Sequence, residues 1–187
     1  MGRKIDARVI RSKELMALSL EKLLQEKDLR SITIKDITET AGLSKNTFYN
    51  NFEDKNALLK YLFTLYGDDI KAASIEKKHY ANNDNLTAFA DGASHVLYEK
   101  KEKFSKILKH DVNKEFYWGV IRGFKVKIQK DFLGEFMAKA NSLDPELVTD
   151  FFAGAFATAV YAVSQGFFNG TEEEFSEFIR LIWKKLL

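Results

Sequence analysis

The 187-residue chain contains no cysteine. Neither a disulfide framework nor a metal site built on thiolates is therefore available to it, which suits a cytoplasmic protein. The first residues also lack the apolar core of a signal peptide, because charged residues interrupt them. These are Arg3, Lys4, Asp6, Arg8 and Arg11. We expect a cytoplasmic location with no export or lipid address.

The usual signs of catalysis are absent as well. The three histidines, His79, His95 and His110, are far apart, and none lies in a His-Glu-x-x-His arrangement. No glycine-rich phosphate loop is present. The sequence therefore predicts a protein that is not an enzyme and holds no cofactor or metal, although a triad assembled from distant residues stays open.

Strong charge of one sign is lacking too, since the formal net charge is only +2. Residues 1–60 carry 12 Lys and Arg against 9 Asp and Glu, a modest basic bias. The basic residues of the first turns form either a solvated tail or an arm that touches phosphate. A hydrophobic content of 45% is ordinary for a globular protein of one compact unit or two small ones.

The most informative stretch runs from Ile32 to Phe52 and reads as a helix, a tight turn and a second short helix. Thr33 can cap the first helix, and Asp36 falls at its third position, where a carboxylate favours the exposed amides. Gly42 can enter the left-handed conformation that ends this helix and turns the chain. Ser44 is then a good cap for the second helix.

The second helix has an apolar side and a polar side. Phe48 and Phe52 lie four residues apart and are expected to point inward. The side chains left on its surface are Lys45, Asn46, Thr47, Tyr49 and Asn50. They have no packing task, and they suit a helix that enters a groove. A Gly-x-Ser corner between amphipathic helices also occurs merely as a packing element.

The complete pattern of these residues resembles the DNA-binding domain of the TetR family of bacterial transcription regulators. Its features are Ala41 before the glycine, an apolar residue after it, the serine cap, Thr-Phe-Tyr-x-x-Phe, and Lys55 three residues beyond. The resemblance extends from about Arg8 to Leu65. Two positions depart from the family pattern: Thr38 stands where alanine is usual, and Asn51 where histidine is frequent.

The resemblance implies that the second helix lies in the major groove of double-stranded DNA. Base reading is then expected from Lys45, Asn46 and Asn50. Phosphate contacts are expected from Thr33, Thr47, Tyr49 and Lys55, and the cap residue Ser44 is included in the DNA-binding set.

Helical periodicity continues on both sides of this motif, so the predicted fold class is all-α. We expect a three-helix DNA-binding domain over 1–53 and a helical regulatory and dimerisation domain over 54–187. The range 54–79 forms a linking helix. The later expected helices start near Asn85, Phe104 and Glu115, and the last of these extends to about 140.

Aromatic side chains are numerous on helices that already have a core to fill. We expect some of them to hold a small apolar or aromatic effector, although core packing is the more ordinary explanation for any single phenylalanine. The expected ligand-binding residues are Phe89, His95, Phe116, Trp118 and Phe124.

Asp144 and Pro145 start a helix that is apolar nearly all round to about Gln165. Its length approaches that of a membrane span. Thr158 and Ser164 dilute it, so we favour a helix buried against its own subunit and a second copy, with no membrane contact. A capping box at Thr171 begins the final helix. The expected homodimer interface comprises Phe152, Phe156, Ala159, Val160, Val163, Phe175, Phe178 and Ile182.

Two functions fit these patterns. The first is a ligand-responsive, dimeric transcription regulator, most often a repressor in this family, that is released from a palindromic operator by a small molecule. The second is a helical protein-interaction or small-molecule-binding module, including a co-regulator, that keeps the helix-turn-helix as a structural corner. The polar surface of the second motif helix favours the first.

Overall fold

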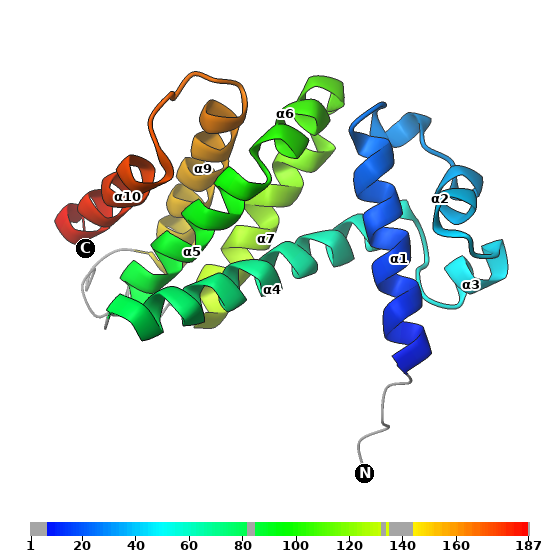
Figure 1. Ribbon diagram of the computed structural model, residues 1–187, viewed down its shortest axis with the longest axis horizontal. Coiled ribbons are helices and arrows are strands. Elements are labelled where there is room, and N and C mark those ends of the chain that lie inside the picture. Colours follow the sequence, from blue (N-terminus) through cyan, green and yellow to red (C-terminus); the bar gives the residue numbers. More distant parts are fainter. Residues whose placement is uncertain (1–6, 82–84, 132–133, 135–143, 187) are drawn as a thin grey trace, which may run out of the picture. The chain divides into compact units, whose positions relative to one another are not determined.

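The computed structural model describes residues 7–81, 85–131, 134 and 144–186. Every regular element in these ranges is helical, which confirms the predicted fold class (Figure 1). The elements are α1 (Ala7–Leu24), η1 (Leu29–Ser31), α2 (Ile34–Ala41), α3 (Lys45–Tyr49), α4 (Lys55–Ala81), α5 (Asn85–Glu99), α6 (Lys101–His110), α7 (Glu115–Asp131), α9 (Pro145–Ser164) and α10 (Glu172–Leu186). The expected continuation of α7 to about residue 140 lies outside the described residues.

The chain forms two compact units that do not follow its order. Unit 1 comprises residues 1–64 and 106–119, and unit 2 comprises 65–105 and 120–187. α4, α6 and α7 therefore each contribute residues to both units. The functional boundary between residues 53 and 54 stays a prediction, since the compact units are defined by packing alone.

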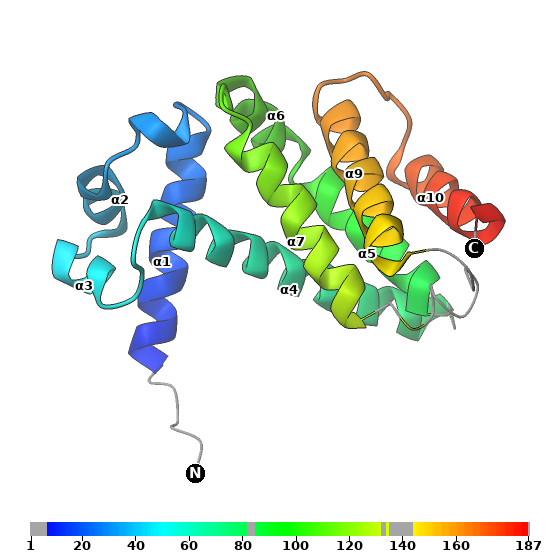
Figure 2. The same cartoon turned by 180° about the vertical axis from the view of Figure 1, so that it is seen from behind.

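Unit 1 is built around the three amino-terminal helices, with α2 and α3 beside α1 (Figure 2). Its largest fully buried side chains include Met16, Leu20, Ile32, Ile37, Phe48, Leu58 and Leu62. Burial of each such side chain stabilises the fold by about 1.5–3 kcal/mol before the entropy of ordering is subtracted. An aromatic chain from Phe48 through Phe52 to Tyr61, with centroids 5.9 and 5.6 Å apart, ties α3 to α4.

The second segment of unit 1 packs on α4. The rings of Phe63 and Phe116 have centroids 5.2 Å apart, and Phe116 is buried. Gly119 makes this approach possible, because a Cβ there would lie 2.1 Å from the ring of Phe63. Residues 106–119 thus belong to the same packed body as the first three helices.

The core of unit 2 lies where α5, α7 and α9 meet. Its buried members are Phe89, Ala90, Ala93, Phe124, Ile128, Val148, Phe152 and Ala153. Phe124 stacks on Phe156 with centroids 4.0 Å apart and ring planes within 7°. α5 also approaches the backbone of α4 closely, since a Cβ on Gly92 would lie 2.7 Å from the carbonyl oxygen of Ile70.

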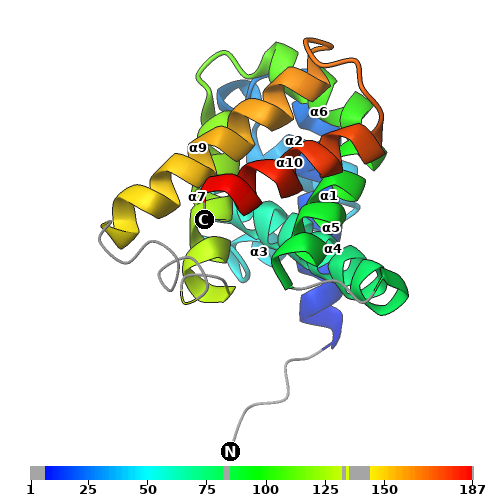
Figure 3. The ribbon, with the colours of Figure 1, turned by 90° about the vertical axis from the view of Figure 1, so that its left-hand side faces the viewer.

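α10 lies beside α5 (Figure 3), and polar side chains connect the two helices. The Tyr98 hydroxyl donates to the Gly170 carbonyl at 2.8 Å, and His95 Nδ1 lies 3.2 Å from Glu172. Arg180 contacts the buried Asp91 at 3.0 Å, and the Ser176 hydroxyl donates to the same carboxylate. Burial, with a smaller effect of nearby carboxylates, raises the pKa of Tyr98.

α9 begins as its sequence predicts, with the Asp144 carboxylate accepting from the Leu147 N–H at 2.9 Å. By length and hydropathy alone this helix could cross a membrane, and 44% of the apolar window is buried inside the chain. Core helices of globular proteins pass the same test. Val148, Phe152 and Ala153 of α9 are buried in the unit 2 core.

Candidate nucleic-acid interface

The first motif helix, α2, is fixed at its start by a reciprocal capping box. Asp36 N–H donates to the Thr33 hydroxyl at 3.1 Å, and Thr33 N–H donates to the Asp36 carboxylate at 2.9 Å. The Lys27 ammonium contacts the same carboxylate at 3.0 Å. The Thr33 N–H, followed by Lys27, lowers the pKa of Asp36 from 3.8 to about 2. Thr33 is therefore held in a defined, exposed position.

The turn between α2 and α3 depends on Gly42, which has φ 65° and ψ 32°. This left-handed conformation costs an L residue roughly 1–2 kcal/mol, and glycine avoids that cost. The N–H groups of Gly42 and Leu43 donate to the Glu39 and Thr38 carbonyls at 3.2 and 2.9 Å, which closes α2. The turn aims α3 away from the axis of α2.

The short helix α3 is capped and anchored by local contacts. Thr47 N–H donates to the Ser44 hydroxyl at 3.1 Å, and the two side-chain hydroxyls lie 2.9 Å apart. Phe48 is fully buried, and Tyr49 meets its ring edge-on at 5.5 Å. One face of α3 is thereby fixed to the core of unit 1, as its sequence predicts.

The opposite face of α3 is polar and exposed. Lys45, Asn46 and Asn50 are all exposed, and 59% of the Tyr49 side chain is accessible. Thr47 is half-buried because its hydroxyl turns towards Ser44. The structure therefore brings the expected base-reading residues together on one accessible surface of a short helix.

Both departures from the family pattern are accommodated locally. The buried Thr38 hydroxyl lies 3.0 and 3.1 Å from the Ile34 and Lys35 carbonyls, so this hydroxyl has acceptors in its own helix. Asn51 Nδ2 donates to the Thr47 carbonyl at 2.7 Å and closes the carboxyl end of α3.

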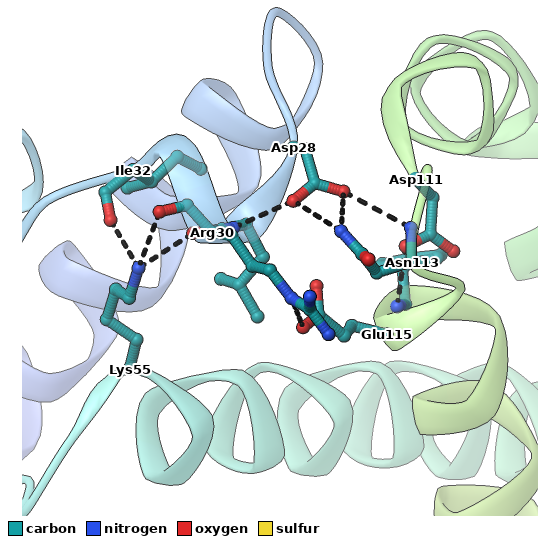
Figure 4. Close-up of polar contacts among 9 residues, drawn as sticks. Asp28, Arg30, Ile32, Lys55, Asp111, Asn113 and Glu115 are labelled. Carbon is teal, nitrogen blue, oxygen red and sulfur yellow. Dashed lines mark hydrogen bonds and ion pairs between the residues drawn. The ribbon is translucent and has the colours of Figure 1, made fainter.

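Lys55 has acceptors that its sequence position did not suggest. Its ammonium donates to the carbonyls of Leu29 at 2.8 Å, Ile32 at 2.5 Å and Arg30 at 3.4 Å (Figure 4). An ammonium has three N–H groups, and these three carbonyls occupy them. Lys55 thus joins the first turn of α4 to η1, directly before the Thr33 cap.

Three carboxylates lie close together beside η1. Their spacing along the chain does not predict this cluster. Oxygens of Asp28, Asp111 and Glu115 lie within 4.8 Å of one another. Donors from the protein meet all three: Asn113 contacts Asp28, Arg30 contacts Glu115, and backbone N–H groups contact Asp111. Burial alone would raise the pKa of Asp28, but the N–H donors of Arg30 and Asn113 offset it and the pKa is lowered.

The five expected ligand-binding residues are divided between the units. Phe116 and Trp118 belong to unit 1, where Phe116 is buried and Trp118 is 53% exposed. Phe89 and Phe124 are neighbours in the unit 2 core, with centroids 5.5 Å apart. His95 lies on α5 and pairs with Glu172 on α10.

Most of the expected interface residues of α9 and α10 face their own chain. Phe152, Val160, Val163 and Phe175 are buried, and Phe156 and Ile182 pack against the unit 2 core. Ala159 is half-buried, and Phe178 is 52% exposed. The sequence could not distinguish the two faces of α9, because both are apolar. Among the side chains of α9 and α10 that the structure describes, the large apolar ones that are exposed are Leu147, Phe151, Phe178 and Leu181.

Comparisons with known proteins agree with this architecture. Residues 20–62 match the family model for "Bacterial regulatory proteins, tetR family". Over 59 residues the chain is 37% identical to YxbF of Bacillus subtilis (strain 168), an uncharacterized HTH-type transcriptional regulator. That match covers 31% of this chain but only 16% of YxbF.

Solved structures with a similar fold extend over nearly the whole chain. One is described as a TetR-family transcriptional regulator from Syntrophomonas wolfei, with 18% identity, a TM-score of 0.61 and coverage of 94% of both chains. The dihydroxyacetone kinase operon activator DhaS has 18% identity and a TM-score of 0.55, with coverage of 94% of this chain and 96% of its own. RolR in complex with resorcinol has 19% identity and a TM-score of 0.55, with coverage of 93% and 88%. At these identities the likeness establishes the fold.

Proposed function

The chain carries the amino-terminal domain of the TetR family within a TetR-like all-helical fold, and we propose that it is a ligand-responsive, dimeric DNA-binding transcription regulator. The observation that carries this proposal is the exposed polar face of α3. Lys45, Asn46 and Asn50 are exposed on this face, while the opposite face is anchored by Phe48. A helix presented in this way fits the major groove of double-stranded DNA.

The residues of the motif divide between two tasks. Lysine can donate to guanine and asparagine can pair with adenine, so Lys45, Asn46 and Asn50 read bases. Thr33 and Tyr49 contact phosphates, which position the protein without reading sequence. The cap residue Ser44, which contacts Thr47, holds α3 in position for both tasks. Lys55 affects DNA binding indirectly, because it holds η1.

Dimerisation is supported by an apolar strip on α9 and α10. Leu147 and Phe151 are one turn apart, and 67% and 61% of their side chains are exposed. Gly154 follows on the same face, and outside its own helix backbone no described atom lies within 4 Å of a Cβ there, which leaves room for a second helix. Phe178 and Leu181 are exposed apolar side chains on α10. A second copy would cover this strip and place two α3 helices on a palindromic operator.

The effector is proposed to be a small aromatic compound bound in unit 2. The support is the cluster of Phe89, Phe124 and Phe156, and the fold similarity to RolR, which binds resorcinol. Phe116 and Trp118 are less suited, since both belong to unit 1. As in most of the family, the protein would act as a repressor in the cytoplasm and leave its operator when the effector binds.

The test is selection of an operator from random duplex DNA, followed by titration of that operator and a scrambled duplex. The parent should prefer the selected sequence, and Asn50→Ala should lose about 1–3 kcal/mol of this discrimination. Lys109→Ala, an exposed substitution on α6, serves as the control. Light scattering should give a dimer, and resorcinol serves as the first effector probe. Equal binding of all sequences would contradict the assignment of α3.

A further inference from the structure

We propose that DNA binding is coupled to α6 and α7 through a polar latch, formed by the contacts of Asp28 with Asn113 and of Arg30 with Glu115. The latch joins η1 to the corner between α6 and α7. The inference rests on the proposed function, because it describes the regulation of the same DNA-binding surface.

The latch consists of side-chain contacts between segments 85 residues apart. Asn113 Nδ2 donates to the two oxygens of the Asp28 carboxylate at 3.2 and 3.3 Å, and the Asn113 N–H approaches at 3.4 Å. Arg30 Nε donates to Glu115 at 3.0 Å (Figure 4). These contacts lie within unit 1, and they attach the α6–α7 corner to the segment that precedes α2.

On its other side, η1 is tied to the DNA-binding surface. Asp28 also caps η1 by accepting from the Arg30 N–H at 2.9 Å. Lys55 holds the carbonyls of Leu29 and Ile32 at the two ends of this short segment. The next residue is Thr33, the cap of α2 and a proposed phosphate contact. A displacement of Asp28 is therefore passed to Thr33 within five residues.

The corner itself has a fixed and strained shape. The buried Asp111 carboxylate accepts from the N–H groups of Phe116 and Tyr117 at 3.1 and 2.9 Å. Lys114, which lies between Asn113 and Glu115, has φ 59° and is the one non-glycine residue with positive φ in the described part of the chain. Such strain persists where the surroundings over-determine it, and it is frequent at switch regions.

The same corner is continuous with helices that leave unit 1. α6 passes from unit 2 into unit 1 between residues 105 and 106, and α7 returns between 119 and 120. A ligand that shifts either helix in unit 2 therefore acts on the corner. Coupling free energies are reciprocal, so DNA that immobilises η1 must also alter the corner.

This reciprocity allows a test with DNA alone, by hydrogen exchange of the full-length protein with and without its selected operator. In the parent we expect saturating operator to slow exchange both in α2–α3 and over residues 106–119, the latter about fivefold or more. The double variant Arg30→Ala/Asn113→Ala removes the side-chain contacts of the latch and leaves only the longer approach of the residue 113 N–H to Asp28, at 3.4 Å. It keeps the Asp28 cap and the Lys55 contacts, because these use the backbone of η1. Operator should then slow exchange in α2–α3 but not over 106–119.

Lys109→Ala is the control, and its exchange should follow the parent in both regions. If the double variant does not fold, the single variant Asn113→Ala takes its place. It leaves the ion pair between Arg30 and Glu115 intact, so operator should still slow exchange over residues 106–119, but less than in the parent. Two outcomes would contradict the latch. In the first, operator protects residues 106–119 in both latch variants as strongly as in the parent. In the second, operator does not protect residues 106–119 in the parent. Absence of protection in α2–α3 of the parent would instead contradict the proposed DNA-binding function.

Discussion

Replacement of Lys55 by methionine separates two roles that this lysine could have. Methionine keeps an unbranched apolar stem of similar length but removes the ammonium that joins α4 to η1. The two part-buried contacts, to the Leu29 and Ile32 carbonyls, each contribute on the order of 1 kcal/mol. We therefore expect Lys55→Met to lower the free energy of unfolding by about 2 kcal/mol.

The effect on DNA binding should be largely independent of salt. A lysine that contacts phosphate contributes about 0.9 to the slope of log K against log salt, which is about 3.5-fold in affinity between 50 and 200 mM. Because the ammonium of Lys55 is held by carbonyls, its loss should leave this slope unchanged and weaken binding only through the position of Thr33.

The assay combines denaturant unfolding with operator titrations at four salt concentrations. Lys60→Met, an exposed lysine on the same helix, is the matched control for loss of one positive charge. A Lys55→Met protein of unchanged stability, whose salt slope is smaller by about 0.9, would refute the tether and restore the phosphate contact expected from the sequence.

Three further outcomes follow from the structure. Gly42→Ala should lower the free energy of unfolding by about 1–2 kcal/mol because of the positive φ at this position, whereas Gly67→Ala within α4 should raise it by about 0.5–1 kcal/mol. Denaturant unfolding measures both changes, and equal changes for the two variants would contradict the role of Gly42. Because the pKa of Asp36 is lowered to about 2, the contribution of this carboxylate to stability is present above pH 4 and is lost as the pH falls towards 2. Asp36→Asn should remove this part of the pH dependence of thermal unfolding, and an unchanged pH profile would argue against the capping box as the cause. Phe178→Lys should give monomers in light scattering, while Phe167→Lys, in the exposed connection after α9, should remain dimeric; a dimeric Phe178→Lys protein would place the interface elsewhere.

Local features of the fold were predictable because their causes are local. The caps at Thr33, Ser44 and Asp144 each join residues three positions apart, so that sequence spacing determines them. The turn at Gly42 follows equally from the conformational freedom of one residue. These features fix α2 and α3, and they account for the correct placement of the exposed face of α3.

Features that depend on distant segments were not predictable in the same way. The contacts of Asp28 with Asn113 span 85 residues, and no periodicity or motif relates the two positions. The partners of Lys55 are backbone carbonyls, which carry no sequence signal. α9 is apolar on both faces, so its sequence could not tell that Phe152 lies in the core and Phe151 at the surface.

The division of unit 1 between two stretches of sequence limits how this protein can be re-engineered. A chimera made by a single cut in α4 would transfer residues 1–64 to another protein but leave residues 106–119 behind. Phe63 would lose the ring of Phe116, and Asp28 would lose Asn113. A transplant that is to retain the native packing of unit 1 must therefore carry both stretches of sequence, so unit 1 is not an interchangeable cassette.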